Sequence, residues 1–433
     1  MGADPEVDEL RAWLVDARER SLALISDLDD DELIGPRLAI VNPLLWEIGH
    51  VAWFHERWVL RFRGEPSLRA DADRLWDSIA IAHDDRWELP LPPREETLAY
   101  ARQVLERVLE RLERERLDPD ERSRVQLTVL HEDMHGEAFA YTRQTLGYSS
   151  PDWPPAGRDT TSIAAEVRGD VRVPGGSFEL GARPGSGFVF DNEQWAHPVK
   201  LEDFWIARSP VTQTEFAEFV DDGGYTRHEL WSEAGWAWRE GAKVRLPLYW
   251  RRAAGGRFER RVFDHWVPLA ATLPLLHVNA HEAEAYCRWA GRRLPSEAEW
   301  EAAASSAAEG DGGLSAEKRR FPWGDDPPGP EHARLDGVGG GPAAVSAAAA
   351  GDSAFGCRQM LGSVWEWTAS AFGPYPGFAP GHYREYSEPW FRGHRVLRGG
   401  CWVTRARLLR NTWRNFYTPE RRDVWAGFRT CRV

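Results

Sequence analysis

The sequence changes character near residue 150, and this change constrains the fold more than any other feature. Before it, four segments carry apolar residues at the spacing of one helical face, at residues 8–28, 43–63, 95–117 and 121–146. After it, Gly, Pro and Trp become frequent and the apolar runs are short. We therefore expect an α+β protein, with a helical first domain at residues 1–150 and a mixed second domain at residues 166–433.

The four helical segments predict a four-helix bundle, in which side chains of neighbouring helices face a shared interior. Pro43 suits an early position of the second helix. Pro151, Pro154 and Pro155 predict a linker at residues 151–165.

Within the second domain, residues 213–220 and 280–290 have the pattern of helices. Residues 306–352 are rich in Gly, Pro and Ala, which is typical of a surface-loop insertion with little capacity for a core. Most of the 23 tryptophans are expected in the core, and some could form a pocket for a cationic ligand.

Three histidines of the helical domain form a candidate metal site. His131 and His135 are four residues apart in the run LHEDMHGEAFAY, so a helix places both on one face. His50 lies in the second helical segment, and a bundle can bring it to the other two. Three imidazoles leave open coordination positions, as in a catalytic site. Imidazole binds zinc, copper, iron and nickel, so these ligands alone do not choose the metal.

The same letters allow other interpretations. His131, Glu132 and His135 spell the zinc-protease motif H-E-x-x-H, in which Glu132 would be the general base of a hydrolase. The longer metzincin form is absent, because no Gly and His follow at the required spacing. The competing pattern is H-x3-H-x-E, with Glu137 behind the ligands and His50 as the third ligand. An isolated pair of this kind can also be ordinary polar helix residues.

Composition excludes several classes of protein. The chain has 433 residues, of which 42% are hydrophobic and 28% charged, as in ordinary globular proteins. A formal charge of −14 argues against nucleic-acid binding, since a phosphate backbone requires a basic face. No apolar run has transmembrane length and no signal peptide follows Met1, so we expect a cytoplasmic protein with no membrane partner. The four cysteines form no C-x-x-C pair and are expected to be buried and structural.

Seven runs of the second domain resemble the formylglycine-generating-enzyme (sulfatase-modifying factor) superfamily, a variant of the C-type lectin fold. In the family's order, they are VPGGSFELGA at 173–182, FWIARSPVTQTEFAEFV at 204–220, AHEAEAYCRWAGRRLPSEAEWEAAA at 280–304, FPWGD at 321–325, GSVWEWTAS at 362–370, VLRGGCW at 396–402 and AGFR at 426–429. Formylglycine-generating enzymes need a cysteine pair shortly after the RGG run. Here Cys401 is followed by WVTRARLL without a second cysteine, which argues against that activity.

A helical bundle with H…H-x3-H-x-E ahead of such a domain resembles the ergothioneine-type sulfoxide synthases over nearly the whole chain. The resemblance implies a DinB-like bundle in which His50, His131 and His135 bind Fe(II). It implies a mononuclear non-heme iron oxidoreductase that uses O2 to join a thiol to the imidazole C2 of hercynine (Nα-trimethylhistidine), leaving a sulfoxide. The run HYREYSE matches the family's tyrosine motif, so Tyr383 would be the catalytic tyrosine and Tyr386 its neighbour in the pocket.

Three departures from that family concern the donor. Members that use γ-glutamylcysteine commonly read HLAH around the first histidine, carry Gln before the third, and have RNWD near the end. Here the corresponding residues are EIGH at 47–50, Met134, and RNFY at 414–417. Tyr417 replaces a carboxylate that could recognise a donor's ammonium group. Asn415 is retained, and Phe416 offers an aromatic face to a trimethylammonium group.

The segment at residues 77–92, together with the LWEIGHVAWF and RNFY runs, looks more similar to the selenoneine synthases, which accept a selenosugar and form a C–Se bond. We therefore expect a selenosugar donor and a selenoxide product, with Arg86, Met134 and Tyr417 as candidate substrate-pocket residues. The alternatives are a sulfoxide synthase that uses γ-glutamylcysteine or cysteine, a zinc hydrolase, and a non-catalytic binding module of the C-type-lectin kind.

Overall fold

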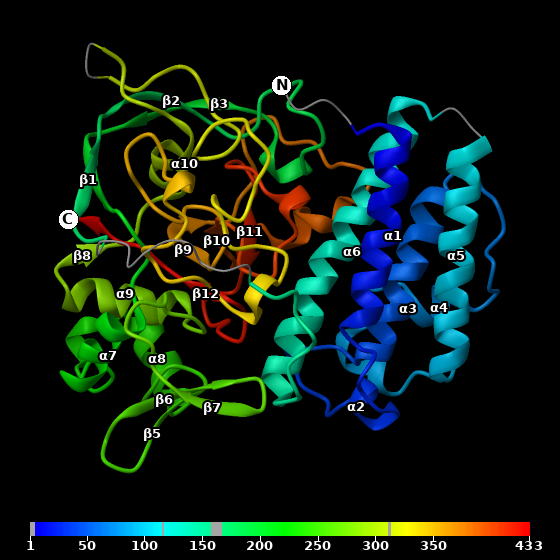
Figure 1. Cartoon of the computed structure of the whole chain (residues 1–433), viewed down its shortest axis with the longest axis horizontal. Coiled ribbons are helices and arrows are strands. Elements are labelled where there is room, and N and C mark those ends of the chain that lie inside the picture. Colours follow the sequence, from blue (N-terminus) through cyan, green and yellow to red (C-terminus); the bar gives the residue numbers. More distant parts are fainter. Residues whose placement is uncertain (1–4, 115–116, 157–166, 311–312) are drawn as a thin grey trace. The chain divides into compact units, whose positions relative to one another are not determined.

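The computed structural model describes residues 5–114, 117–156, 167–310 and 313–433 (Figure 1). They divide into two compact units, residues 1–152 and 153–433, each described here by itself. Residues 157–165 of the expected linker lie outside the described residues. No helix in the described ranges is both long enough and apolar enough to cross a membrane.

The first unit is a bundle, as expected from the four amphipathic segments. Among its described residues, the four long helices run alongside one another (Figure 1) and are α1 (Val7–Ala23), α3 (Leu44–His55), α5 (Arg94–Arg114) and α6 (Pro119–Leu146). The shorter elements are α2 (Asp30–Ile34), the π-helical turn η1 (Glu56–Leu60), α4 (Ala72–Trp76) and the 3-10 turn η2 (His83–Trp87).

Local chemistry explains where α6 begins. The carboxylate of Asp118 accepts the N–H of Glu121 at 2.9 Å, and the Glu121 carboxylate accepts the N–H of Asp118 at 3.1 Å. This capping box, with Pro119 in the first turn, satisfies amides that have no partner within the helix. The fixed start of α6 sets the direction in which its two histidines, His131 and His135, point from the helix.

Helix α3 is the central element, because every residue from Leu44 to His55 is buried. It contacts α5 and α6 along its length. At Gly49, an added Cβ would lie 2.1 Å from Nε1 of Trp76, so only glycine lets the Trp76 indole lie directly on the helix. This close contact brings α4 against α3 beside His50.

The second unit has mixed helix and sheet. Its described strands form a sheet of order β1-β4-β13-β8 and a sheet of order β11-β10-β9-β12, together with the hairpin β2-β3 and the three-stranded β5-β6-β7. All pairs are antiparallel except β12 with β9. The strands are β1 (Asp170–Val173), β2 (Gly176–Leu180), β3 (His197–Leu201), β4 (Phe204–Ala207), β5 (Trp250–Arg252), β6 (Phe258–Val262), β7 (His265–Pro268), β8 (Arg292–Arg293), β9 (Trp365–Ala371), β10 (Arg395–Arg398), β11 (Asn415–Tyr417), β12 (Ala426–Gly427) and β13 (Cys431–Arg432).

Four α-helices are found among the described residues of this unit. Two were expected, α7 (Gln213–Asp221) and α9 (Ala280–Trp289), and two were missed, α8 (Glu233–Gly241) and α10 (Glu297–Ser305). Both missed helices carry a serine cap, since the hydroxyl of Ser232 accepts the N–H of Gly235 and that of Ser296 accepts the N–H of Glu299. A serine directly before a helix is a helix-start signal, and the sequence contained it in both places.

The expected insertion at residues 306–352 has no α-helix or named strand among its described residues, and contains only the short 3-10 turns η5 (Val338–Gly340) and η6 (Ala349–Gly351). Phe321, Leu335 and Val345 are nevertheless buried. The expectation of little capacity for a core is therefore wrong, because the segment contributes apolar side chains to the interior.

Buried ion pairs explain several of the family-like runs. The Arg429 guanidinium donates to Glu366 at 2.6 Å, and Arg414 donates to Glu297 at 2.7 Å. Arg398 of the RGG run pairs with Glu301. Removing one partner of such a pair leaves an uncompensated buried charge, so these residues hold the fold together. All four cysteines are buried, as expected, and no disulfide joins them among the described residues.

Candidate metal centre

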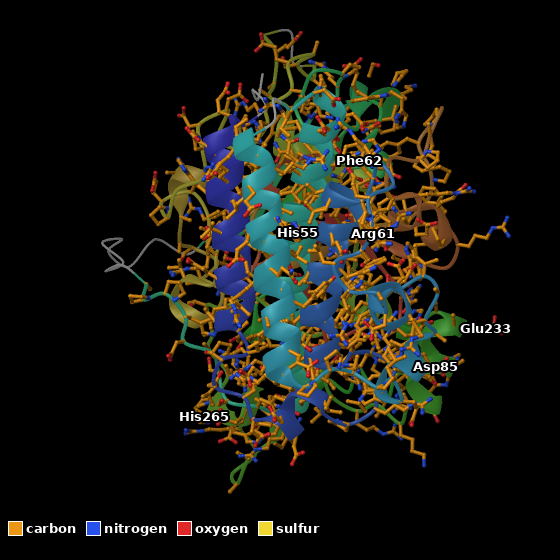
Figure 2. All side chains as sticks on the ribbon, turned by 90° about the vertical axis from the view of Figure 1, so that its right-hand side faces the viewer. His55, Arg61, Phe62, Asp85, Glu233 and His265 are labelled. Atoms are coloured by element: carbon orange, nitrogen blue, oxygen red, sulfur yellow. The ribbon has the colours of Figure 1, made fainter. Side chains whose placement is uncertain are left out.

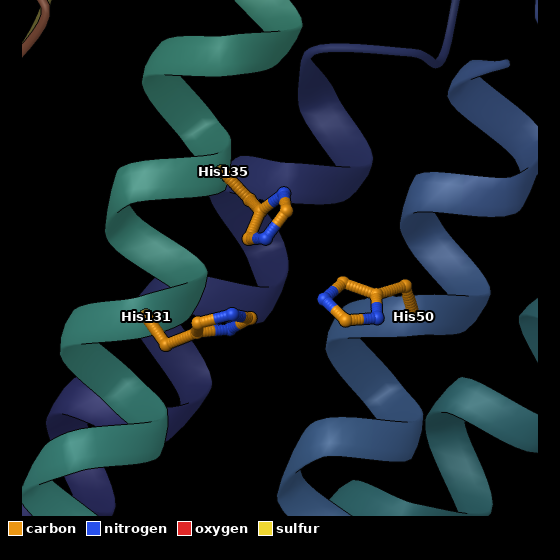
Figure 3. A group of neighbouring side chains, drawn as sticks. All are labelled: His50, His131 and His135. Atoms are coloured by element: carbon orange, nitrogen blue, oxygen red, sulfur yellow. The ribbon is translucent and has the colours of Figure 1, made fainter. Parts of the chain in front are cut away.

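The three expected histidines meet in the first unit. His50 comes from α3, and His131 and His135 come from successive turns of α6 (Figure 3). One ligand nitrogen from each lies within 4.8 Å of the others. Metal–nitrogen bonds are about 2.0–2.1 Å long, so one ion can join the three nitrogens after a small adjustment of the side chains.

Hydrogen bonds orient two of the rings. Nδ1 of His50 lies 2.8 Å from the carbonyl oxygen of Trp76, and Nδ1 of His135 lies 2.8 Å from Oε1 of Glu47. Each Nδ1 is therefore the protonated nitrogen, which leaves the Nε2 lone pair for a metal. The residues present thus fit a metal ion held by imidazoles.

Burial keeps two of the three histidines, His50 and His131, neutral. It lowers the pKa of His50 and of His131 well below 6.5, and the nearby His135 lowers both further. A metal binds the neutral form of imidazole, so these two residues need no deprotonation at neutral pH.

Aromatic rings fix the planes of two ligands. Trp46 stacks on His50 with centroids 4.9 Å apart, and Phe54 stacks on His131 with centroids 3.6 Å apart. Trp46, His50 and Phe54 are spaced by four residues on α3, so one helical face supplies a ligand and both stacking rings. The centre is rigid on this side.

Glu132 is not placed to be a hydrolytic base. Its carboxylate is 1% exposed, accepts from Arg18 Nε at 2.7 Å, and lies 2.8 Å from Nε2 of His55 (His55 is labelled in Figure 2). Burial alone would raise the pKa of Glu132, but Arg18 and His55 lower it. A carboxylate held in this ion pair cannot readily accept a proton from a metal-bound water. The H-E-x-x-H interpretation is therefore contradicted by the geometry.

Sequence reasoning missed Glu47. It anticipated Glu137 as the carboxylate behind the ligands, whereas the carboxylate bonded to His135 comes from α3. Glu47 is 1% exposed, and within the described part of the chain its Oε2 has no hydrogen-bond partner. The available signal was the i, i+3 spacing of Glu47 and His50 in EIGH.

Arg86 lies close to this centre and Met134 is adjacent to a ligand. The Arg86 guanidinium stacks over Trp46 at 4.1 Å, on the ring that also packs against His50, and donates to Oδ1 of Asn42 at 2.6 Å. Met134 is half-buried on α6, next to His135.

The other expected site residues belong to the second unit. Tyr386, in the 3-10 turn η7 (Arg384–Tyr386), stacks on Phe190 at 4.5 Å and meets the ring of Phe416 edge-on at 5.9 Å. Burial raises the pKa of Tyr386. Tyr383 directly precedes η7 and is half-buried. The structure thus brings Tyr386 and Phe416 together.

Strand β11 carries three of the expected site residues, Asn415, Phe416 and Tyr417. One face of Phe416 stacks on Phe372 at 4.0 Å. Asn415 uses its side-chain oxygen to accept the N–H of Phe416 at 2.8 Å. The Arg421 guanidinium lies over the Tyr417 ring at 5.4 Å.

A buried serine holds the segment that contains both tyrosines. Ser387 donates to the carboxylate of Asp191 and accepts from Nδ2 of Asn192 at 3.0 Å. The N–H of Gly381 donates to the same Asp191 at 3.2 Å. Residues 381–387 are therefore attached at both ends to the 3-10 turn η3 (Asp191–Glu193).

Comparison with known proteins agrees with this two-part structure. Residues 14–138 match the DinB superfamily, and residues 158–433 match the sulfatase-modifying factor enzyme 1-like domain. The chain is 39% identical to hercynine oxygenase of Mycolicibacterium smegmatis, over 95% of this chain and 96% of that protein. It is 40% identical to hercynine oxygenase of Mycobacterium tuberculosis over 98% of both. The formylglycine-generating enzyme of Streptomyces coelicolor is 31% identical and matches 61% of this chain and 88% of its own.

Proposed function

The chain belongs to the hercynine oxygenase family, and from this premise we propose that it is an O2-dependent mononuclear non-heme iron oxidoreductase acting at C2 of the hercynine imidazole. The observation that carries the proposal is the histidine triad, whose ligand nitrogens lie within 4.8 Å of one another. Relatives that are 39–40% identical over almost the whole chain are named for hercynine.

His50, His131 and His135 would hold the Fe(II). A ferrous ion bound by three imidazoles supplies open coordination positions at which O2 can be activated. The Trp76 carbonyl and Glu47 keep Nδ1 of two ligands protonated, which presents Nε2 to the ion. Trp46 and Phe54 stop the His50 and His131 rings from turning.

The overall reaction balances with one O2. The imidazole C2–H and the Se–H or S–H bond of the donor are broken, and a C–Se or C–S bond forms. One oxygen atom ends on the chalcogen and the other leaves as water, so the two substrates supply four electrons. We assign Tyr383 as the residue that donates a proton or a hydrogen atom during this reduction, with Tyr386 beside it in the pocket.

Phe416 is the candidate for recognising the acceptor. Its face away from Phe372 can receive a trimethylammonium group, an interaction worth about 0.5–2 kcal/mol. Asn415 holds the backbone of Phe416 and so fixes the strand that presents this ring.

The donor we favour is a selenosugar. Tyr417 stands where a carboxylate could have paired with a donor's ammonium group, and the cationic Arg421 lies over its ring. Arg421 is itself paired with Asp423, so the missing carboxylate is what bears on the donor: an ammonium-bearing donor would lack its partner here, whereas a sugar has no such group. Arg86 and Met134 are the candidate pocket residues of the first unit. The alternative in the same family is a sulfoxide synthase that uses γ-glutamylcysteine or cysteine, since the names of the relatives specify hercynine but no donor.

The test is mass spectrometry of the products formed by Fe(II)-loaded protein with hercynine and O2, offered a 1-selenosugar, γ-glutamylcysteine and cysteine in competition. We expect a selenium-bearing hercynine adduct, and none from the His131→Ala variant. A sulfoxide adduct in its place would keep the enzyme class and overturn the selenosugar. Unchanged hercynine with every donor would contradict the proposed reaction.

A further inference from the structure

We propose that the second unit carries a binding site for one small protonated oxyanion, with hydrogen phosphate as the prototype. The site is a hollow lined in part by Tyr249, Trp250, Arg260, Arg261 and His277. Trp250 and Arg260 lie on β5 and β6 of the sheet β5-β6-β7, which is labelled in Figure 1. Its enclosed part has room for about one water molecule, and the remaining space is open to solvent, so one oxygen of a bound oxyanion would enter the hollow and the rest of the ion would lie in its mouth. It plays no part in the proposed oxygenase reaction.

Arg260 supplies a cation without a counter-charge. Its guanidinium makes no ion pair or hydrogen bond with any described residue, and its Nε is buried without an acceptor. Burial lowers the pKa of Arg260, and no neighbouring carboxylate opposes this effect. Arg260 is half-buried, and a guanidinium with a buried, unpaired Nε is stabilised when an anion pairs with it.

The surroundings of Arg260 are basic. Arg261 lines the same hollow, where its guanidinium lies over Tyr249 at 4.5 Å and donates to the Phe263 carbonyl at 2.7 Å. None of the residues found lining the hollow in the described chain is acidic. The nearby Asp423 is bound by Arg421 through both carboxylate oxygens.

Other arginines of the same hairpin do have carboxylate partners. Arg251 donates to Glu259 at 2.8 Å, and Arg252 donates to Asp221 at 2.5 Å. The chain thus neutralises the arginines on β5 internally and leaves Arg260, on the neighbouring strand, to an external anion.

His277 adds an acceptor to this basic hollow. It is 6% exposed, and its Nδ1 has no hydrogen-bond partner among the described residues. The main-chain carbonyls of Asp423 and Val424 bind the ring, and therefore bind Nε2–H. Burial and the two arginines lower the pKa of His277 to about 3, so Nδ1 is an unprotonated acceptor at neutral pH.

An unused donor and an unused acceptor together define the ligand. A tetrahedral oxyanion can accept from the Arg260 guanidinium, and one that also carries an O–H can donate to Nδ1 of His277. Hydrogen phosphate has both properties at pH 7. Sulfate has the same shape but no proton, and would leave the buried Nδ1 without a partner, at a cost in affinity.

The test is calorimetric titration of the full-length protein with inorganic phosphate and with sulfate, at pH 7 and equal ionic strength. We expect one phosphate to bind, about tenfold or more tightly than sulfate. Arg260→Met should weaken phosphate binding by about tenfold or more, and Arg251→Met should leave it unchanged. His277→Gln, which removes the acceptor, should abolish the preference for phosphate over sulfate.

Three results would overturn the proposal. The first is no phosphate binding by the wild-type protein at millimolar concentration, which would mean that water alone fills the hollow. The second is unchanged phosphate affinity in Arg260→Met or, should that variant not fold, in Arg260→Lys, which keeps the charge and removes the planar donor group. The third is tighter binding of glycerol phosphate than of inorganic phosphate, which would exclude a free ion as the ligand.

Discussion

At the scale of single residues, Glu47 distinguishes His135 from the other ligands. His50 is backed by a neutral carbonyl, whereas His135 is backed by a buried carboxylate. A carboxylate behind a ligand imidazole raises its basicity and fixes its orientation. The electron donation from His135 to a bound metal should therefore depend on Glu47.

We expect Glu47→Gln to lower the affinity for Fe(II), or for Co(II) as a spectroscopic probe, by roughly 10–100-fold, and Glu47→Asp to recover part of it. The same substitution should raise the Fe(III)/Fe(II) potential, because the carboxylate stabilises the higher charge. Glu56→Gln is the matched control, since Glu56 is also buried but accepts from Ser67 and from the N–H of Leu68. Equal metal affinity in Glu47→Gln and the wild type would refute this role.

Glu132 should behave as a structural residue. Glu132→Gln breaks a buried ion pair with Arg18, and we expect the free energy of unfolding to fall by about 3–5 kcal/mol. Urea unfolding of the metal-free protein measures this loss. Because the carboxylate is turned to Arg18 and His55, the folded fraction of the variant should still bind metal. An unchanged free energy of unfolding together with lost metal binding would contradict this structural role and indicate that Glu132 acts at the metal centre.

At the scale of elements, the segment at residues 381–387 depends on few buried contacts. Ser387→Ala removes the hydroxyl that joins this segment to Asp191 and Asn192. We expect faster amide hydrogen exchange across residues 381–390 and lower turnover, with unchanged metal affinity. Ser209→Ala is the control, because Ser209 donates to a main-chain carbonyl elsewhere in the same unit. Unchanged exchange in Ser387→Ala would show that other contacts hold the segment.

Helical spacing predicted the long elements and the shared face of His131 and His135, because both follow from the local sequence. The phase of α6 alone places His131 and His135 on one face, and amphipathic patterns mark the bundle. The partners behind the ligands were not predictable in this way. Glu47 is 88 residues from His135, and Arg18 is 114 residues from Glu132, so these contacts depend on how the helices pack.

Short elements were harder to predict than long ones. Helices α8 and α10 each have nine residues, and their serine caps were the main local signal. The apolar residues of 306–352 are scattered among Gly and Pro, without a period that would reveal burial. Their place in the core is set by contacts with the rest of the second unit.

At the scale of the whole molecule, both units bury neutral histidines. Burial is the main cause that lowers the pKa of His50, His55 and His131 in the first unit and brings that of His277 in the second to about 3. In the unfolded chain these groups titrate near 6.5. Between pH 7.5 and 5.5 the unfolded state therefore takes up protons that the folded state does not.

The sign of the effect follows from this difference in bound protons. Stability is fully present above pH 6.5 and is lost as the pH falls toward the lowered pKa values, by up to about 1.4 kcal/mol per pH unit for each histidine. Burial raises the pKa values of Asp191 and Glu282, so these two groups act in the opposite direction and favour the folded state as the pH falls. In the unfolded chain they titrate near pH 4. Four histidines have lowered pKa values and two carboxyl groups have raised ones, so we expect the histidines to set the sign of the net change between pH 7.5 and 5.5.

Urea unfolding of the metal-free protein at pH 7.5, 6.5 and 5.5 measures this dependence. We expect a steep loss of stability below pH 6.5, and a shallower loss in His277→Gln, which removes one of the four groups. Bound Fe(II) should deepen the loss, because protons compete with the metal for His50 and His131. A stability that stays constant from pH 7.5 to 5.5 would mean that the folded and unfolded chains bind protons equally, and would contradict the lowered pKa values of the buried histidines.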